Sequence, residues 1–406
     1  MTDRAYALFE QQQKDRGIDL EKVKEKLKAL QVETPSWGYG DSGTRFKVFQ
    51  QVGVPRNPYE KFEDAAQVHK FTGICPSVAI HIPWDKVDDY ADLARHAREL
   101  GLKVGAINPN LFQDDDYKFG SVTNVDARIR RKATDHLLEC VEIAKATGSK
   151  VLSLWFADGT NYPGQGDFRR RKHWMYECLK EMYDAMDSDM RMLIEYKFFE
   201  PAFYHTDLAD WGMAYNMALK LGPQAQVLVD TGHHAQGVNI EHIVAYLIDE
   251  KRLGGFHFNS RKYADDDLIV AAHNPYELFL IFVEILNAMH DPDEEVRKTA
   301  ENIAYMLDQC HNLEPKIPAM IRSIINVQTQ YAKALLVNFD ELKEAQSKND
   351  VLAAENAVRE AFETDVRPLL SAVREEMGVP QDPLKAYMES GYGEKILARG
   401  KGGASW

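Results

Sequence analysis

Acidic and imidazole side chains recur where short apolar runs of this chain end. The runs LIEYK, VLVDTGH, GFHFN and YMLDQ each close on such a group, and KYADDDL adds an acidic cluster. These segments contain Glu195, Lys197, Asp230, His233, His257, Asp265, Asp267 and Asp308. Five carboxylates and two imidazoles in one cavity would be costly to bury unless cations neutralise the acids. The pattern therefore predicts a site for two divalent metal ions.

The residue types also indicate what the ions would be. Ligands that are mostly oxygen, with a minority of nitrogen, suit Mn²⁺, Co²⁺, Mg²⁺ or Zn²⁺. Glu195 and Lys197 are two residues apart on a predicted strand, so both point to the same side. We expect Lys197 to lie beside a substrate oxygen without being a ligand.

Each residue taken alone has a simpler interpretation. Asp230 or Asp308 could cap the helix that follows its strand. His257 could be a hydrogen-bonded core histidine, and residues 265–267 could be a solvated loop. Glu195 resists such an interpretation, because a charge in a buried parallel strand is costly unless it is paired. The metal site is favoured because all these residues follow successive strands.

The elements that would bring these residues together are strands alternating with helices. Strands are predicted at residues 36–39, 78–82, 103–107, 151–156, 192–196, 226–229, 255–258 and 303–307, and helices at 87–100, 126–147, 206–221 and 240–251. Eight strands suit an α/β fold of the closed (β/α)₈ TIM barrel type, although an open sheet can also hold eight. The barrel is favoured because its strands end at one mouth, where active sites of this fold lie.

The rest of the chain is predicted to be helical. Residues 1–34 form an N-terminal helical segment, and residues 35–312 form the barrel. Residues 313–390 form a C-terminal extension, with helices at 319–345 and 350–376, that we expect to make oligomer contacts. Residues 391–406 are rich in glycine and basic side chains and are expected to be a flexible tail.

Composition narrows the classes of partner. The chain has 406 residues with 49 Lys and Arg against 63 Asp and Glu, a net charge of −14 that argues against nucleic acid. Its apolar stretches, such as residues 278–283, are far shorter than the roughly 20 residues of a membrane helix. Without a signal-like apolar run near the N-terminus, we expect a cytoplasmic protein. The four separated cysteines are expected to be reduced and packed.

Several segments resemble a known family. SWGYGDSGTRF, SVAIHIPWD, LWFADGTNYPGQGDF, IEYKFFEP, VLVDTGHH and GFHFNSRKYADDDLIV are similar to segments of the bacterial L-rhamnose isomerases, specifically their broad-specificity branch. The resemblance extends over residues 35–312. It implies a (β/α)₈ barrel, a homotetramer and two divalent ions per chain, with Mn²⁺ expected and Co²⁺, Mg²⁺ or Zn²⁺ as alternatives.

The resemblance also implies a role for each matched residue. A structural metal would take Glu195, Asp230, His257 and Asp308. A catalytic metal would share Glu195 and add His233, Asp265 and Asp267. Lys197, Glu195, His233 and Asp308 are the expected catalytic residues, and Trp37, Phe46, His81 and Trp155 the expected substrate-binding residues. Phe46 is expected to close the pocket of a neighbouring subunit.

The implied reaction is the interconversion of L-rhamnose and L-rhamnulose, and of other sugars such as D-allose and D-allulose, L-mannose and L-lyxose. Hydrogen could move as a hydride between carbons or as a proton through an enediol, and the residues serve either route. A ketose 3-epimerase and a two-metal hydrolase on the same barrel are the alternative enzymes. A barrel that only binds carbohydrate would be expected to lack some ligands, and none is missing.

Overall fold

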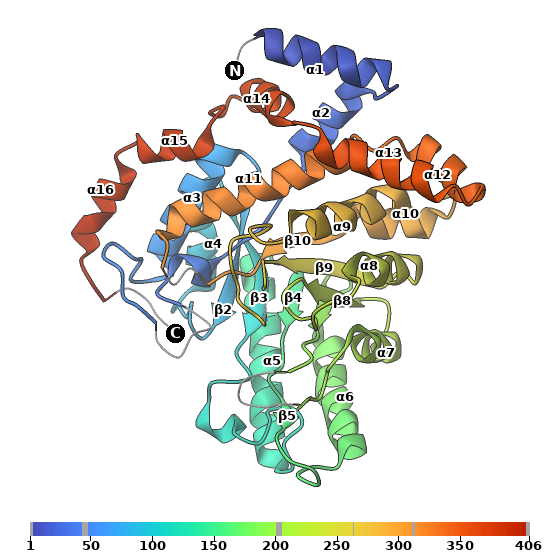
Figure 1. Ribbon diagram of the computed structural model, residues 1–406. Helices are drawn as coiled ribbons and strands as arrows, with labels where there is room; N and C mark the ends of the chain where they lie inside the picture. Colours follow the sequence, from blue (N-terminus) through green and yellow to red (C-terminus); the bar gives the residue numbers. More distant parts are fainter. Residues whose placement is uncertain (1–2, 43–47, 200–204, 263, 311–312, 403–406) are drawn as a thin grey trace.

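The computed structural model describes residues 3–42, 48–199, 205–262, 264–310 and 313–402 (Figure 1). A parallel eight-stranded sheet lies at its centre, in the order β1-β2-β3-β4-β6-β8-β9-β10. The strands are β1 (Thr34–Pro35), β2 (Ser77–Ile82), β3 (Lys103–Pro109), β4 (Val151–Leu154), β6 (Arg191–Glu195), β8 (Ala225–Asp230), β9 (Leu253–Phe258) and β10 (Ala304–Leu307). Their residues are almost all buried, as expected for parallel strands covered on both faces.

The sheet closes into a barrel through one residue. Glu33 bridges Met306 in parallel, donating its N–H to the Tyr305 carbonyl at 2.8 Å and accepting from the Leu307 N–H at 3.0 Å. The Glu33 carboxylate reaches across the barrel floor and accepts the Ala106 N–H at 2.9 Å. The predicted (β/α)₈ barrel is confirmed.

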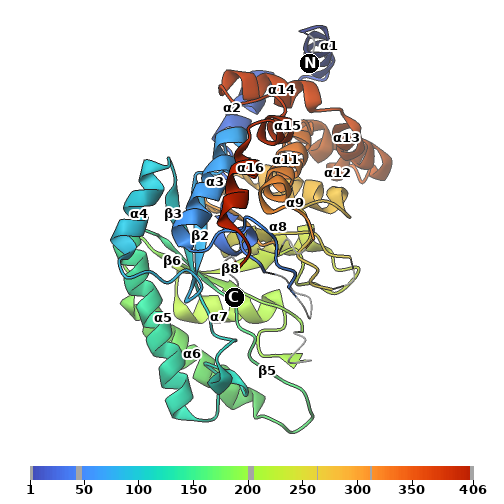
Figure 2. The ribbon, with the colours of Figure 1, turned by 90° about the vertical axis from the view of Figure 1, so that its left-hand side faces the viewer.

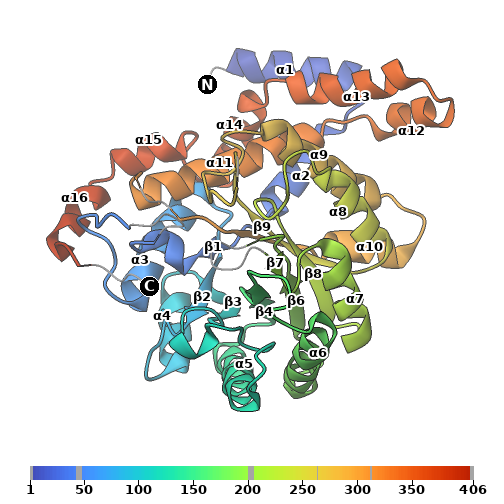
Figure 3. The ribbon, with the colours of Figure 1, turned by 60° about the horizontal axis from the view of Figure 1, so that its bottom comes forward.

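Helices surround the strands, as the view along the barrel in Figure 3 shows. They are α3 (Pro58–Thr72), α4 (Tyr90–Glu99), α5 (Ala127–Thr147), α6 (Phe168–Ala185), α7 (Trp211–Leu221), α8 (Ile240–Asp249), α9 (Pro275–Ala288), α10 (Glu294–Glu301) and α11 (Lys316–Ala334). From α3 to α10, each helix begins after an Asp or Asn whose side chain accepts a backbone N–H of the first turn.

The remaining helices gather on one side of the barrel (Figures 1 and 2). They are α1 (Asp3–Asp15), α2 (Leu20–Ala29), α12 (Phe339–Ser347), α13 (Val351–Glu363), α14 (Arg367–Glu376), α15 (Pro383–Met388) and α16 (Tyr392–Ile396). Three short 3₁₀ helices are η1 (Ser36–Tyr39), η2 (Asp115–Tyr117) and η3 (Leu397–Arg399), and β5 (Gly159–Thr160) pairs with β7 (His205–Thr206). Among the described helices, none combines the length and apolar character needed to cross a membrane.

Seven predicted strands coincide with observed ones, but the first does not. Residues 36–39 form η1, and the strand is the preceding pair Thr34–Pro35. The chain turns here because the Gly40 N–H returns to the Trp37 carbonyl at 3.1 Å and the Ser36 hydroxyl bonds the buried Asp85. This turn carries the Trp37 side chain to the mouth of the barrel.

Three helical predictions also change. The start predicted at Thr206 falls in β7, and α7 begins after its N-cap, Asp210. The two long helices predicted after the barrel are four, α11 to α14. Part of the segment expected to be a flexible tail is helical, because α16 and η3 occupy residues 392–399. All four cysteines are buried free thiols, as predicted.

Candidate active site

The barrel interior changes from apolar to polar near the ends of its strands. An inner apolar layer contains Ala79, Ala106, Leu193, Leu228 and Met306. Strand residues two apart face the same side, so the residues that follow this layer by two positions also face the interior. Those residues are His81, Asn108, Glu195, Asp230 and Asp308. The local alternation of these five strands thus places one polar side chain from each at the barrel mouth.

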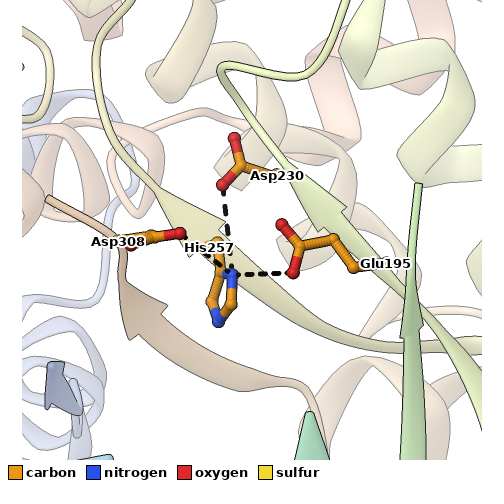
Figure 4. Close-up of side chains that lie close together, drawn as sticks. All are labelled: Glu195, Asp230, His257 and Asp308. Carbon is orange, nitrogen blue, oxygen red and sulfur yellow. Dashed lines mark ion pairs between the residues drawn. The ribbon is translucent and has the colours of Figure 1, made fainter. Parts of the chain in front are cut away.

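Four of the predicted ligands form a first group around His257 (Figure 4). The His257 Nδ1 atom lies 3.2 Å from Glu195 Oε2, 3.6 Å from Asp308 Oδ2 and 4.0 Å from Asp230 Oδ2. One ligand atom from each of the four residues lies within 4.8 Å of the others. That spacing suits atoms arranged around one ion, whose bonds to oxygen or nitrogen are about 2.0–2.6 Å.

Two atoms of this group are buried without a hydrogen-bond partner among the described residues, namely Glu195 Oε1 and His257 Nδ1. A buried polar atom without a partner costs about 1–3 kcal/mol. A bound cation would satisfy such atoms, so the first group fits a metal.

A second group consists of Asp230, His233 and Asp265. The His233 Nε2 atom lies 3.4 Å from Asp265 Oδ2 and 4.0 Å from Asp230 Oδ2. On the other side of the ring, Nδ1 lies 3.0 Å from the Tyr196 carbonyl oxygen. A carbonyl can only accept, so Nδ1 donates to it, and Nε2 is the nitrogen that faces the acids and could bind a metal after losing its proton. Ring orientation of this kind is typical of a metal-binding histidine.

The grouping differs in two details from the one that the resemblance implies. Asp230 belongs to both groups, whereas Glu195 was the expected shared ligand. Asp267 lines the same cavity but is a member of neither group. Asp265 Oδ1 is a further buried atom without a hydrogen-bond partner among the described residues.

Neighbouring residues hold these carboxylates in place. The Asn259 amide donates to Asp230 Oδ1 at 3.0 Å, to Asp230 Oδ2 at 3.1 Å and to Asp267 Oδ1 at 3.4 Å. The Gly232 N–H donates to Asp230 at 2.6 Å, and the Trp37 indole donates to Asp308 at 2.8 Å. Asn259 lies two residues after His257 and is not among the site residues predicted from the sequence.

The neighbouring carboxylates raise the pKa values of the two imidazoles. Burial lowers the pKa of His233, but Asp230, Asp265 and Glu195 outweigh burial and raise it to about 10. Burial likewise opposes the charge of His257, and Glu195 with Asp308 raises its pKa to about 9. The metal-free protein therefore keeps both imidazoles protonated near neutral pH, and these positive charges lie where cations would bind.

The pKa values of the neighbouring carboxylates are shifted in opposite directions. Burial, with the charges of Glu195 and Asp265, raises the pKa of Asp230 to about 7, and burial also raises that of Asp267. Burial opposes the ionisation of Asp265, but Lys197 and His233 outweigh it and hold its pKa far below the usual range. The Lys197 ammonium lies 2.9 Å from Asp265 Oδ2.

The two groups open into a cavity of about 650 Å³ at the barrel mouth. Its aromatic wall includes Trp37, His81, Trp84, Phe112 and Trp155. His81 stacks on Trp84 with ring centroids 3.7 Å apart, and the Phe112 ring packs against Trp155 at 4.7 Å. Lys197 is the sole lysine or arginine in the described lining. Phe46, the other predicted pocket residue, lies outside the described residues.

Three buried polar atoms of this wall have no hydrogen-bond partner among the described residues: His81 Nδ1, Ser153 Oγ and Trp155 Nε1. All three residues line the cavity, so a bound hydroxylated molecule could satisfy them. The cavity lining also includes four residues that were not predicted from the sequence: Trp84, Asn108, Phe112 and Ser153. Extending the period-two alternation back from Trp155 along its strand would have indicated Ser153.

The simpler interpretation of the strand-end acids as helix caps does not hold. Helix α8 is capped by Asn239 rather than Asp230, and α11 begins after Pro315 with no side-chain cap. His257 is buried, but its Nδ1 atom faces the carboxylates of Glu195, Asp308 and Asp230, an acidic environment that a core histidine does not need.

Comparison with known proteins places this chain in a family. Residues 64–269 match the family described as xylose isomerase-like TIM barrel. The chain belongs to the xylose isomerase-like TIM barrel family. It is 46% identical over 388 residues to a probable sugar isomerase of Rhizobium meliloti (strain 1021), covering 94% of this chain and 89% of the relative.

A second relative of this xylose isomerase-like chain is a probable sugar isomerase of Mesorhizobium japonicum. The two are 42% identical over 98% of this chain and 92% of the relative. Among solved structures, a D-allulose 3-epimerase from Methylomonas sp. aligns with a TM-score of 0.52 and 12% identity, covering 74% of this chain and 98% of that one. At that identity the likeness concerns the fold alone.

Proposed function

We propose that this protein is a metal-dependent aldose–ketose isomerase that acts on free monosaccharides. The observation that carries the proposal is the pair of carboxylate–imidazole groups that share Asp230 and open into an aromatic-walled cavity. The probable sugar isomerases to which the chain is 46% and 42% identical over nearly its whole length support the same reaction class.

The cavity lining favours a neutral sugar over a sugar phosphate. The one lysine of its described lining, Lys197, already pairs with Asp265, and that lining offers no arginine to bind a phosphate. Aromatic faces pack well against the C–H surfaces of a sugar. The chain's net charge of −14 disfavours the alternative of a two-metal hydrolase if its substrate is a phosphodiester, because such a substrate is also negatively charged.

The resemblance refines the proposal to L-rhamnose and L-rhamnulose, with D-allose, L-mannose and L-lyxose as further aldoses. Glu195, Asp230, His257 and Asp308 would hold one divalent ion, and Asp230, His233 and Asp265 the other, with Asp267 beside it. When bound, such ions polarise a carbonyl and ease the ionisation of a nearby hydroxyl or water. Mn²⁺ is the ion we expect.

The residues of the chain would orient the sugar and stabilise charge. Lys197, at the end of β6, would donate to the sugar oxygen that becomes negative as the carbonyl moves between C1 and C2. The unpartnered atoms of His81, Ser153 and Trp155 would bond sugar hydroxyls. The buried cavity would exclude water from the reacting carbons.

A direct test uses protein stripped with a chelator and then supplied with Mn²⁺, assayed on L-rhamnose and D-allulose. We expect Mn²⁺-dependent formation of L-rhamnulose from L-rhamnose and of D-allose from D-allulose. Glu195→Gln should lower turnover at least about 10²-fold. Conversion of D-allulose to D-fructose without D-allose would instead show a 3-epimerase, and absence of turnover despite two bound ions per chain would reject both enzymes.

A further inference from the structure

Lys197 lies on a loop, yet both its backbone N–H and its backbone carbonyl form hydrogen bonds. The Lys197 N–H donates to the Leu208 carbonyl at 3.0 Å, and the Lys197 carbonyl accepts a short hydrogen bond from the Thr206 hydroxyl. Thr206 is 1% exposed and belongs to β7. Segment 206–208 therefore fixes the position from which the Lys197 side chain reaches Asp265.

The same segment is tied to the loop that carries Trp155. Strand β7 pairs antiparallel with β5, with Thr206 opposite Gly159, and the Asp207 N–H donates to the Asp158 carbonyl at 2.9 Å. Trp155 directly follows β4, in the loop that leads to β5, and the Lys197 ammonium lies 5.1 Å from the centroid of its ring. The backbone and the aromatic neighbour of Lys197 thus depend on one small sheet, whose strand β7 is labelled near β6 and β8 in Figure 3.

A buried polar cluster, here named the loop anchor, holds that sheet. It consists of Thr123, Asp158, Arg171 and Asp207. Arg171 on α6 binds both oxygens of Asp207 at 2.7 to 3.1 Å, with both side chains 7% exposed. Arg171 also donates to the Thr123 hydroxyl at 2.7 Å, to the Gly159 carbonyl at 3.2 Å and to the Phe119 carbonyl at 3.3 Å.

Asp158 completes the loop anchor. Its carboxylate accepts the Thr123 N–H at 2.9 Å and the Thr123 hydroxyl at 2.6 Å, and it also accepts the backbone N–H and the hydroxyl of Ser121. Loops that follow β3, β4 and β6 are thereby joined to helix α6. Buried charges with this many hydrogen bonds form a rigid unit, because any displacement leaves a charge unpaired.

We propose that Thr206 and the loop anchor position Lys197 and Trp155 for the reaction. The described lining of the cavity includes neither Thr206 nor any residue of the anchor, so they act through Lys197 and are positioning residues. A small displacement of a catalytic group costs up to about 10²-fold in rate. The proposal rests on the isomerase function proposed above.

The test compares Thr206→Val with Thr206→Ser, because valine keeps the shape of threonine without its hydroxyl and serine keeps the hydroxyl. A matched control is Thr72→Val, which removes another buried hydroxyl that donates to a carbonyl, that of Val68, at the end of α3. The proposed role of Lys197 is to stabilise charge in the transition state. Thr206→Val should therefore lower kcat about tenfold and change KM less than twofold. Thr206→Ser and Thr72→Val should keep kcat within about twofold.

A second readout does not depend on turnover. In metal-loaded protein without sugar, the acetylation rate of Lys197 by acetic anhydride, followed by mass spectrometry, should rise at least about threefold in Thr206→Val only. If wild-type protein shows no isomerase activity, the proposed function fails while this labelling still tests the anchoring of Lys197. If Lys197 in Thr206→Val is acetylated at the same rate as in wild-type protein, the positioning role is overturned, whether or not kcat falls.

Discussion

Asn259 shows how one neutral side chain can set the affinity of the proposed metal site. It donates to both oxygens of Asp230, the residue that the two groups share. Asn259→Asp keeps the size of the side chain but replaces the donor with a negative charge. We expect the Mn²⁺ dissociation constant to rise about 10–100-fold, measured by equilibrium dialysis.

The matched control for this change is Asn326→Asp on α11. Its side-chain amide is likewise a donor, but to the backbone carbonyl of Val270 at 2.8 Å rather than to a carboxylate. Mn²⁺ affinity should stay at the wild-type value in this variant. Equal affinities in Asn259→Asp and wild-type protein would refute the role of Asn259.

At the scale of elements, the barrel floor depends on a glycine in β3. A Cβ atom built on Gly105 would lie 1.7 Å from a carboxylate oxygen of Glu33, which is the residue that closes the barrel. Gly105→Ala must therefore displace Glu33 and its bond to the Ala106 N–H. We expect a loss of about 2–4 kcal/mol in the free energy of unfolding, measured with urea.

The control for this prediction is Gly393→Ala on α16. The nearest atom that a Cβ would meet there is the Tyr387 hydroxyl at 3.9 Å, so we expect a change within about 0.5 kcal/mol. Equal stabilities of the two variants would show that the barrel floor tolerates the displacement of Glu33.

The contact between the C-terminal helices and α3 leads to a second prediction at this scale. Arg399, 8% exposed, binds Asp64 on α3 through Nη1 at 2.9 and 3.0 Å, and the Tyr392 hydroxyl donates to the same carboxylate at 2.9 Å. Figure 2 shows α16 beside α3. Arg399→Ala leaves a buried carboxylate without its cation, a loss of about 3 kcal/mol, so residues 389–402 should detach and be cleaved faster in limited proteolysis.

Arg359→Ala on α13 is the control, because it removes an exposed ion pair with Glu355 that contributes about 0.5 kcal/mol or less. Its cleavage pattern should match that of wild-type protein. Slow cleavage of the C-terminal segment in Arg399→Ala would show that other contacts hold α16 and η3.

At the scale of the whole molecule, metal binding and stability are linked through pH. The raised pKa values of His233 and His257, about 10 and 9, mean that the metal-free folded protein binds protons that the unfolded chain releases above about pH 6.5. These protons stabilise the metal-free protein fully below that pH, and the stabilisation is lost as pH rises toward 9 and 10. Asp230, with a pKa of about 7, acts in the same direction between its unfolded value near 4 and pH 7.

A divalent ion must displace these protons, so its apparent affinity should rise by up to about tenfold per pH unit for each proton released. We expect the Tm of Mn²⁺-loaded protein to exceed that of chelated protein by a margin that grows from pH 6 to pH 8, measured by scanning calorimetry. A constant or shrinking margin would show that the imidazoles are not displaced by the ion.

Most elements of this fold could be predicted from the sequence, because buried strands and amphipathic helices leave local periodic patterns. The site residues could be listed for a related reason. Each predicted ligand on a strand lies at or next to its end, and a charge in a buried strand, such as Glu195, is visible in the sequence alone. The side of the strand that each one faces also follows from its period of two.

Tertiary structure decided which atoms meet. That Asp230 rather than Glu195 is common to both groups, and that Asn259 bonds it, depends on the order and stagger of strands far apart in sequence. Barrel closure by Glu33 and the docking of Arg399 on Asp64 likewise rest on long-range contacts that leave no periodic signal. Local sequence determines how each element buries its own face, whereas the meeting of two side chains depends on the packing of the whole chain.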